Sequence, residues 1–128
     1  MRSVNPQGWE RPKGYNNGIV ARGDVLAVAG QIGWNERNEF LSDRFLDQAV
    51  QALRNVVAVV RAAGGSPSQI VRLTWYVIDK HEYLESAREL GAAYREILEG
   101  HYPAMSLVVV AALLEDRARV EIEATAVI

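Results

Sequence analysis

The chain has 128 residues, with 14 Lys and Arg against 16 Asp and Glu, so its formal net charge is −2. This balance argues against a protein that holds nucleic acid or an anionic membrane through a basic surface. The absence of cysteine excludes disulfides, thiol nucleophiles, iron–sulfur clusters and thiolate zinc sites. No apolar run approaches the roughly 18 residues of a membrane span, and the polar N-terminal segment predicts no signal peptide. We therefore expect one soluble, cytoplasmic domain over residues 1–128.

The N-terminal third is expected to be irregular at first and then β-structured. Residues 1–14 contain Pro, Gly and Asn at short intervals, which predicts an irregular lead-in. Two short β-type runs follow at 18–22 and 25–31, joined at Gly23-Asp24. The polar segment 33–41 predicts a loop with room for a short strand.

Two helices are predicted from apolar residues that recur every three or four positions. The first covers 46–60, with Ser42 as its expected N-cap and Gly64-Gly65 as its left-handed C-terminal cap. The second covers 83–98 and is closed by Gly100.

The remaining segments predict strands. Residues 70–78 are rich in β-branched and aromatic side chains, and 105–114 and 118–128 flank a tight connection at 115–117 that indicates a hairpin. The element order is therefore β-β-α-β-α-β-β. This order predicts a single-domain α+β fold in which two helices lie on one face of a mixed sheet.

The predicted strands are apolar on both sides, which bears on assembly. Two helices cover only one face of a sheet, so the other face needs a different cover. A second copy of the chain is the simplest candidate, because large apolar patches are rare on monomers. We therefore expect an oligomer. For 70–78 the two sides are Val71, Leu73, Trp75 and Val77, and Ile70, Thr74, Tyr76 and Ile78.

The last strand alternates between small or apolar residues and polar ones. Ala118, Val120, Ile122, Ala124 and Ala126 form one side, and Arg119, Glu121, Glu123 and Thr125 form the other. If the polar side faces an interface, desolvated carboxylates there suit general acid/base chemistry. The alternative is a solvated strand face with cross-strand ion pairs, and periodicity alone leaves both open.

Other polar features carry less chemistry. The segment 14–18 is a possible ligand loop, but Asn and Gly are also ordinary turn formers. His81 and His101 lie beside helix ends and are expected at the surface. Trp75 is expected in the core or at an interface, since no basic groove accompanies it.

Six segments, in this order and spacing, resemble the RidA (YjgF) family, also labelled endoribonuclease L-PSP or reactive intermediate deaminase. They are spread over nearly the whole chain. They are 26–33 (LAVAGQIG), 48–55 (QAVQALRN), 62–65 (AAGG), 72–79 (RLTWYVID), 102–104 (YPA) and 120–124 (VEIEA).

The resemblance implies a chorismate-mutase-like fold and a homotrimer with active sites in clefts between subunits. It also implies hydrolysis of enamines or imines to ketones and ammonia without a metal or organic cofactor. In active members an arginine after the Tyr-Pro pair holds the substrate carboxylate, and a glutamate handles the water and its protons. A tyrosine near the N-terminus and the Gly-Gln-Ile backbone shape the pocket.

Matched position by position, the catalytic glutamate is Glu121. The substrate-binding positions that match are Tyr15, Gly30, Gln31, Ile32, Met105 and Ser106. Met105 stands where the family has its arginine, so this chain resembles a divergent member. An asparagine of the family's second helix has no clear counterpart, and Gly91 falls nearby.

Met105 changes the expected substrate. A thioether has no charge and no strong donor, so it cannot pair with a carboxylate. A hydrogen bond to a charged group contributes about 1.5–3 kcal/mol, so its loss weakens 2-imino acid binding about ten- to a hundredfold. The sequence therefore predicts a deaminase of a less charged imine or enamine, with Glu121 activating water.

Two other functions stay open. One is a small-molecule-binding or regulatory trimer without catalysis, since Glu121 could also be structural. The other is RNA cleavage, which the slightly negative charge and the lack of a basic–aromatic groove disfavour.

Overall fold

The computed structural model describes residues 1–128. The α+β fold class is confirmed, and no helix is both long and apolar enough to cross a membrane. The elements are β1 (Arg2–Val4), β2 (Gly18–Val20), β3 (Val25–Ile32), α1 (Phe45–Ala62), the 3₁₀ turn η1 (Pro67–Gln69), β4 (Ile70–Val77), α2 (Lys80–Glu85), α3 (Ala87–Ile97), β5 (Ala104–Val109) and β6 (Val120–Val127).

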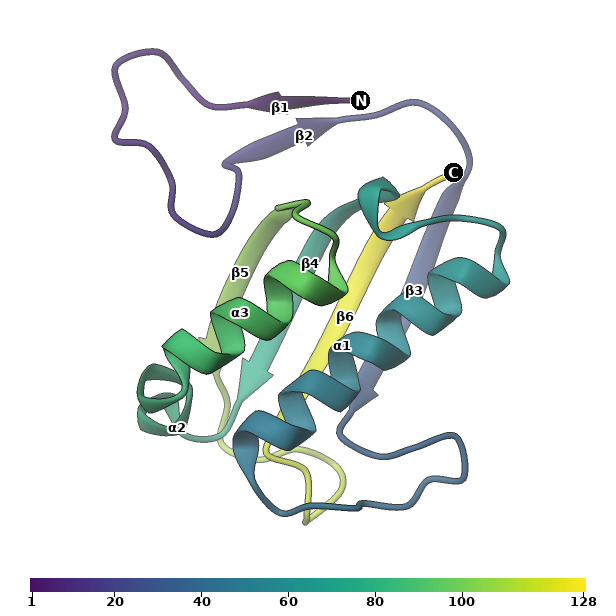
Figure 1. The fold of residues 1–128 in the computed structure, drawn as a ribbon, viewed down its shortest axis with the longest axis vertical. Helices are drawn as coiled ribbons and strands as arrows, with labels where there is room; N and C mark the ends of the chain where they lie inside the picture. Colours follow the sequence, from purple (N-terminus) through teal and green to yellow (C-terminus); the bar gives the residue numbers. More distant parts are fainter.

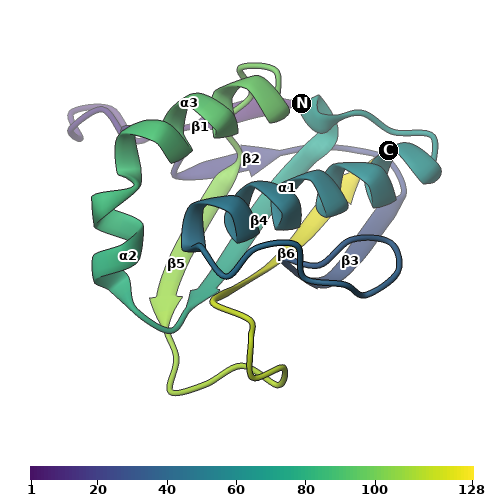
Figure 2. The same cartoon turned by 60° about the horizontal axis from the view of Figure 1, so that its bottom comes forward.

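The main sheet has the strand order β3-β6-β4-β5. β6 is antiparallel to both of its neighbours, and β4 and β5 are parallel, so the sheet is mixed. Both long helices, α1 and α3, lie on the same side of this sheet (Figure 1), and the turned view shows them stacked over it (Figure 2). The other side, here called the open face, has no helix or strand over it.

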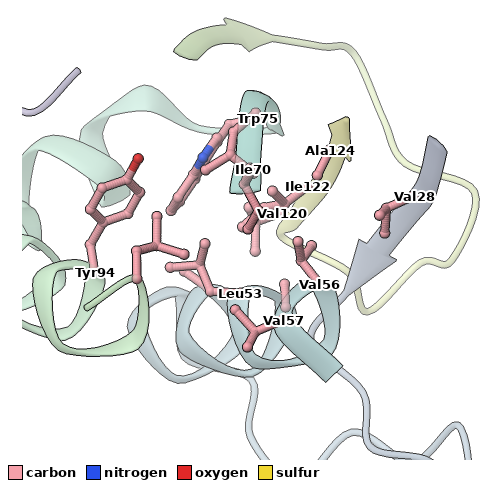
Figure 3. Close-up of a cluster of buried hydrophobic side chains, with 14 of the residues drawn as sticks. Val28, Leu53, Val56, Val57, Ile70, Trp75, Tyr94, Val120, Ile122 and Ala124 are labelled. Carbon is pink, nitrogen blue, oxygen red and sulfur yellow. The ribbon is translucent and has the colours of Figure 1, made fainter. Parts of the chain in front are cut away.

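The core fills the space between α1, α3 and the sheet. The predicted three-and-four spacing of α1 is confirmed, because Ala49, Leu53, Val56 and Val60 are all fully buried. Figure 3 shows side chains of α1 pointing toward those of β4 and β6. The sheet contributes Leu73, Trp75, Val77, Val120, Ile122, Ala124 and Ala126 to this core.

The C-terminal cap of α1 is the one predicted, but its N-cap residue is not. At the C-terminal end Gly64 has φ +86°, and Gly65 donates its N–H to the Val60 carbonyl at 3.0 Å, which is the predicted left-handed cap. At the N-terminal end the prediction of Ser42 was wrong, since Arg44 is the N-cap residue. The Ser42 hydroxyl instead accepts from the Arg44 N–H and donates to Asp47, which shapes the turn before the helix.

The predicted hairpin between the last two strands is wrong. β5 ends at Val109 and pairs only with β4, while β6 lies on the other side of β4. Both ends of the 110–119 connection bond to the end of β4, since Val110 donates to the Val77 carbonyl and Ile78 donates to the Arg119 carbonyl. The connection therefore crosses the end of β4 and does not fold back on itself.

Two further elements differ from the prediction. The second helix is divided into α2 and α3 at Ser86, and the N-cap residue of α2 is Asp79, whose side chain accepts from the His81 N–H at 2.9 Å. The predicted irregular lead-in contains β1, which pairs with β2 in a separate two-stranded sheet. β2 therefore pairs with β1 and not with β3.

A register shift in β4 changes which residues share a face. The shift lies between Ile70 and Arg72, so Ile70 is fully buried on the helix side, contrary to the predicted strict alternation. The open face of β4 then carries Arg72, Thr74 and Tyr76. This face is more polar than predicted, although it remains uncovered.

Candidate functional site

Glu121 lies on the open face of the sheet against the backbone of β3. It pairs in register with Tyr76 of β4 and is half-buried. The register of β3 shifts between Val28 and Gln31, and Gly30 lies in this irregularity. A Cβ added at Gly30 would stand 2.4 Å from Oε2 of Glu121. The missing side chain of Gly30 is thus what leaves room for the Glu121 carboxylate.

The charged side chains two residues before and after Glu121 already have partners. Glu123 accepts a hydrogen bond from the Tyr76 hydroxyl at 2.6 Å, and this bond is the main cause of the raised pKa of Tyr76. Arg119 donates to Glu82 of α2 through Nε at 2.6 Å and also forms an ion pair with it. Glu121 makes no hydrogen bond or ion pair within the chain. Of the predicted polar row, Glu121 is therefore the carboxylate left free to act.

A cavity of about 390 Å³, here called the aromatic cavity, lies on the other side of the sheet, between α3 and β5. Five aromatic residues contribute to its wall, together with Met105, whose register partner is the buried Leu73. The lining residues are Lys13, Gly14, Tyr15, Trp75, Tyr83, Ala87, Leu90, Gly91, Tyr94, Tyr102 and Met105.

The aromatic rings of this cavity form a continuous row. Ring centroids are 6.1 Å apart for Trp75 and Tyr83, 6.4 Å for Trp75 and Tyr94, and 5.9 Å for Tyr94 and Tyr102. Nε1 of Trp75 and the hydroxyl of Tyr94 are buried without a hydrogen-bond partner. Burial raises the pKa of Tyr94 far above its ordinary value.

Alkaline unfolding should reveal this shift. The unfolded chain loses the Tyr94 proton near pH 10 while the folded chain retains it, so the free energy of unfolding falls as pH rises above about 10. We expect this fall to be shallower in Tyr94→Phe, which urea titrations at pH 9 and pH 11 would measure. Equal slopes for the two proteins would show that Tyr94 is not shielded from water.

The N-terminal segment is fixed to the start of β5. Asn16 donates its backbone N–H to the Pro103 carbonyl at 3.3 Å and its side-chain amide to the Tyr102 carbonyl at 2.6 Å. This attachment places Tyr15 beside Met105, where both residues line the aromatic cavity and a second hollow of about 370 Å³ that includes Ser106. The 14–18 loop therefore forms part of a cavity wall.

The predicted site residues fall into two groups within one protomer. Tyr15, Met105 and Ser106 gather at β5, whereas Glu121 lies beside Gly30 at β3 and β6. Of the other two pocket positions, the Gln31 side chain bonds to the Ala29 carbonyl at 3.0 Å, and the Ile32 carbonyl accepts from Asn55 at 3.1 Å.

These two groups cannot meet inside one chain. β4 lies between β6 and β5 in the sheet. Met105 belongs to the helix side, where it packs against the core, and Glu121 belongs to the open face.

Sequence reasoning missed most of the aromatic wall. Tyr83 and Tyr94 fit the apolar stripe of the second helix, so the pattern assigned them to the core. His81 is exposed as predicted, but His101 is half-buried and its Nε2 lies 2.7 Å from the Ile70 carbonyl. No group of three or more His, Asp or Glu residues is arranged to hold a metal ion.

Comparison with known proteins places this geometry in a family. The family model described as endoribonuclease L-PSP matches residues 9–128. A 2-iminobutanoate/2-iminopropanoate deaminase from Dermatophagoides farinae is 34% identical over 119 residues, covering 92% of this chain and 89% of the relative. A protein of the same name from Escherichia coli K12 is 35% identical over 111 residues, covering 84% and 83%.

A solved structure agrees with these sequence matches. YyfB from Yersinia pestis, a protein of unknown function of the conserved Rid family, has a TM-score of 0.83 and 33% identity, covering 99% of this chain and 98% of its own. The chain therefore belongs to the RidA family, the endoribonuclease L-PSP family of the matching model.

Proposed function

We propose that the protein is a cytoplasmic hydrolytic deaminase of an imine or enamine other than the usual small 2-imino acids. The reaction adds water to a C=N bond and releases a carbonyl compound and ammonia. Its main support is Glu121, a carboxylate without a partner of its own, held over Gly30 in a family with relatives named as imine deaminases.

The proposed site is composite and needs a second protomer. Glu121 and Met105 lie on opposite faces of one sheet, and the edge strands β3 and β5 have no further strand beside them. Packing the β3 side of one chain against the β5 side of the next, with the open faces turned inward, would place Glu121 beside the hollow at β5 that Arg72 and Ser106 line together with Met105. Such a contact is head-to-tail and forms a ring when the rotation between neighbouring chains closes, and we propose a homotrimer. Sedimentation at micromolar concentration should give three chains, and a stable monomer would contradict the proposal.

In this site Glu121 would act on the water. A carboxylate held 2.6–3.2 Å from a water can take its proton as the oxygen attacks the imine carbon, and can then return a proton to the leaving nitrogen. Covering the open face would exclude bulk water and strengthen this electrostatic contact. Arg119 is committed to Glu82 and Glu123 to Tyr76, so neither competes for the same proton.

Met105 supports a substrate without a carboxylate at that position. Its side chain is packed against the core and lines both hollows at β5, where it offers dispersion contacts but no charge. The same observation favours a second candidate, a trimer that binds a small molecule without converting it. Ammonia release from imines generated in situ by an amine oxidase or an amino-acid oxidase distinguishes the two functions.

The contact between Gly30 and Glu121 gives a direct test of the deaminase. In Gly30→Ala the new Cβ overlaps the carboxylate group of Glu121, whose flexible end can move aside without unfolding the chain. We expect about a tenfold or greater loss of turnover with little change in melting temperature, on the scale of losses from small misplacement of catalytic groups. Ala29→Ser, one residue away and exposed, is the matched control. Full activity in Gly30→Ala would remove Glu121 from the mechanism.

A further inference from the structure

The aromatic cavity is larger and more specialised than a pocket for a small imine requires. We infer that it binds an aryl group of the substrate. The inference rests on the proposed function, because it names the substrate class of the same composite site.

The size and lining of the cavity suit an aromatic ring. Its volume of about 390 Å³ falls within the usual range for small-molecule sites, about 300–1,000 Å³. Trp75, Tyr83, Tyr94 and Tyr102 line it as a row of edge-to-face, tilted and stacked pairs with neighbouring centroids 5.9–6.4 Å apart. A further ring placed against this row gains contacts of the same kinds.

The cavity is also open toward the reacting centre. Met105 lines both the cavity and the neighbouring hollow at β5, so a ring in the cavity would place its substituent beside Met105. Gly91 and Ala87 lie one turn apart on the exposed side of α3, and a Cβ added at Gly91 meets nothing within 4 Å. These small residues leave the entrance wide enough for a ring.

The reaction for this class balances without a further reactant. An aryl imine, R–CH=NH, takes the oxygen of water at carbon, the C–N bond breaks, and the products are R–CHO and NH₃. No oxidant or reductant is needed. Lys13 is the only charged residue of the lining and is exposed, so the interior carries no charge. A neutral aryl imine therefore fits better than a dicarboxylate or a short 2-imino acid.

Calorimetric binding of three neutral amides to the intact oligomer tests the inference. We expect phenylacetamide and 4-hydroxyphenylacetamide to bind, and acetamide to bind at least about tenfold more weakly than either. Gly91→Phe should weaken both aryl amides about tenfold by filling the cavity, while Ala92→Phe, the next position on α3 and outside the lining, should not.

Binding and turnover separate this inference from the proposed function. Equal binding of acetamide and the aryl amides, or no effect of Gly91→Phe, would overturn the aryl pocket. Tight aryl binding without ammonia release from the imine of tyramine would uphold the pocket and refute the deaminase. Brisk turnover of small imines without aryl binding would uphold the deaminase and refute the aryl pocket.

Discussion

Replacing Glu121 with Gln is expected to lower imine turnover by about two orders of magnitude or more. Gln keeps the shape of the side chain over Gly30 but cannot accept a proton from water, and loss of a general base typically costs 10²–10⁴-fold in rate. The folded oligomer should persist, since Glu121 makes no hydrogen bond or ion pair that holds the chain together. Rates of ammonia release, with sedimentation of the same samples, measure both effects.

Glu123→Gln is the matched control for this prediction. Glu123 lies two residues along β6 on the same face, but it already accepts the Tyr76 hydroxyl. We expect its substitution to change turnover by less than about threefold, because it acts on no water. If Glu121→Gln retains full activity, or if Glu123→Gln loses as much, the catalytic assignment of Glu121 fails.

Replacing Met105 with Arg is expected to raise hydrolysis of small 2-imino acids about ten- to a hundredfold. The wild-type protein should hydrolyse them poorly, because nothing at position 105 pairs with their carboxylate. A guanidinium there supplies two parallel donors, and a charge-assisted hydrogen bond contributes about 1.5–3 kcal/mol. Keto-acid release from imines generated by an amino-acid oxidase provides the comparison.

Met105→Gln is the control, because Gln is a polar side chain of similar size without a charge. We expect no gain in 2-imino acid hydrolysis from this substitution. An arginine buried without substrate could also form an ion pair with Glu121 of the neighbouring protomer, which would cost activity but not oligomerisation. Brisk turnover of 2-imino acids by the wild-type protein would contradict the first half of this prediction. A folded but inactive Met105→Arg oligomer would favour the binding protein without catalysis.

The elements with a clean periodicity could be predicted from the sequence. The apolar stripe along α1 and the alternation along β6 each predict one buried face. Both of these faces are buried in the structure. The alternation also identified Glu121 as a residue of the open face. Its partner Gly30 was found only by resemblance, since nothing in the sequence pattern marks the register shift that places this glycine under the carboxylate.

The elements that depend on long-range pairing could not be predicted in the same way. The segments of β5 and β6 are adjacent in the sequence, which favoured a hairpin, but β4 lies between them. The shift after Ile70 moved this residue to the helix side of β4, against strict alternation. The aromatic cavity could not be predicted, because a tyrosine at helical spacing fits a core stripe as well as it fits a cavity wall. Only the packing of α3 against β5 leaves the space open.

Hetero-oligomers test most directly whether the active site is shared between protomers. Glu121→Gln chains and Met105→Trp chains, the latter with an indole that fills the hollows at β5, would each form an inactive homotrimer. The two kinds of chain are co-expressed with different affinity tags, and mixed trimers are purified by both tags in turn. In each mixed trimer, one of the three interfaces combines an intact Glu121 with an intact Met105. We predict recovery of about a third of the wild-type turnover, as closed head-to-tail symmetry requires. Doubly tagged trimers that stay as inactive as either parent would contradict a site shared between protomers.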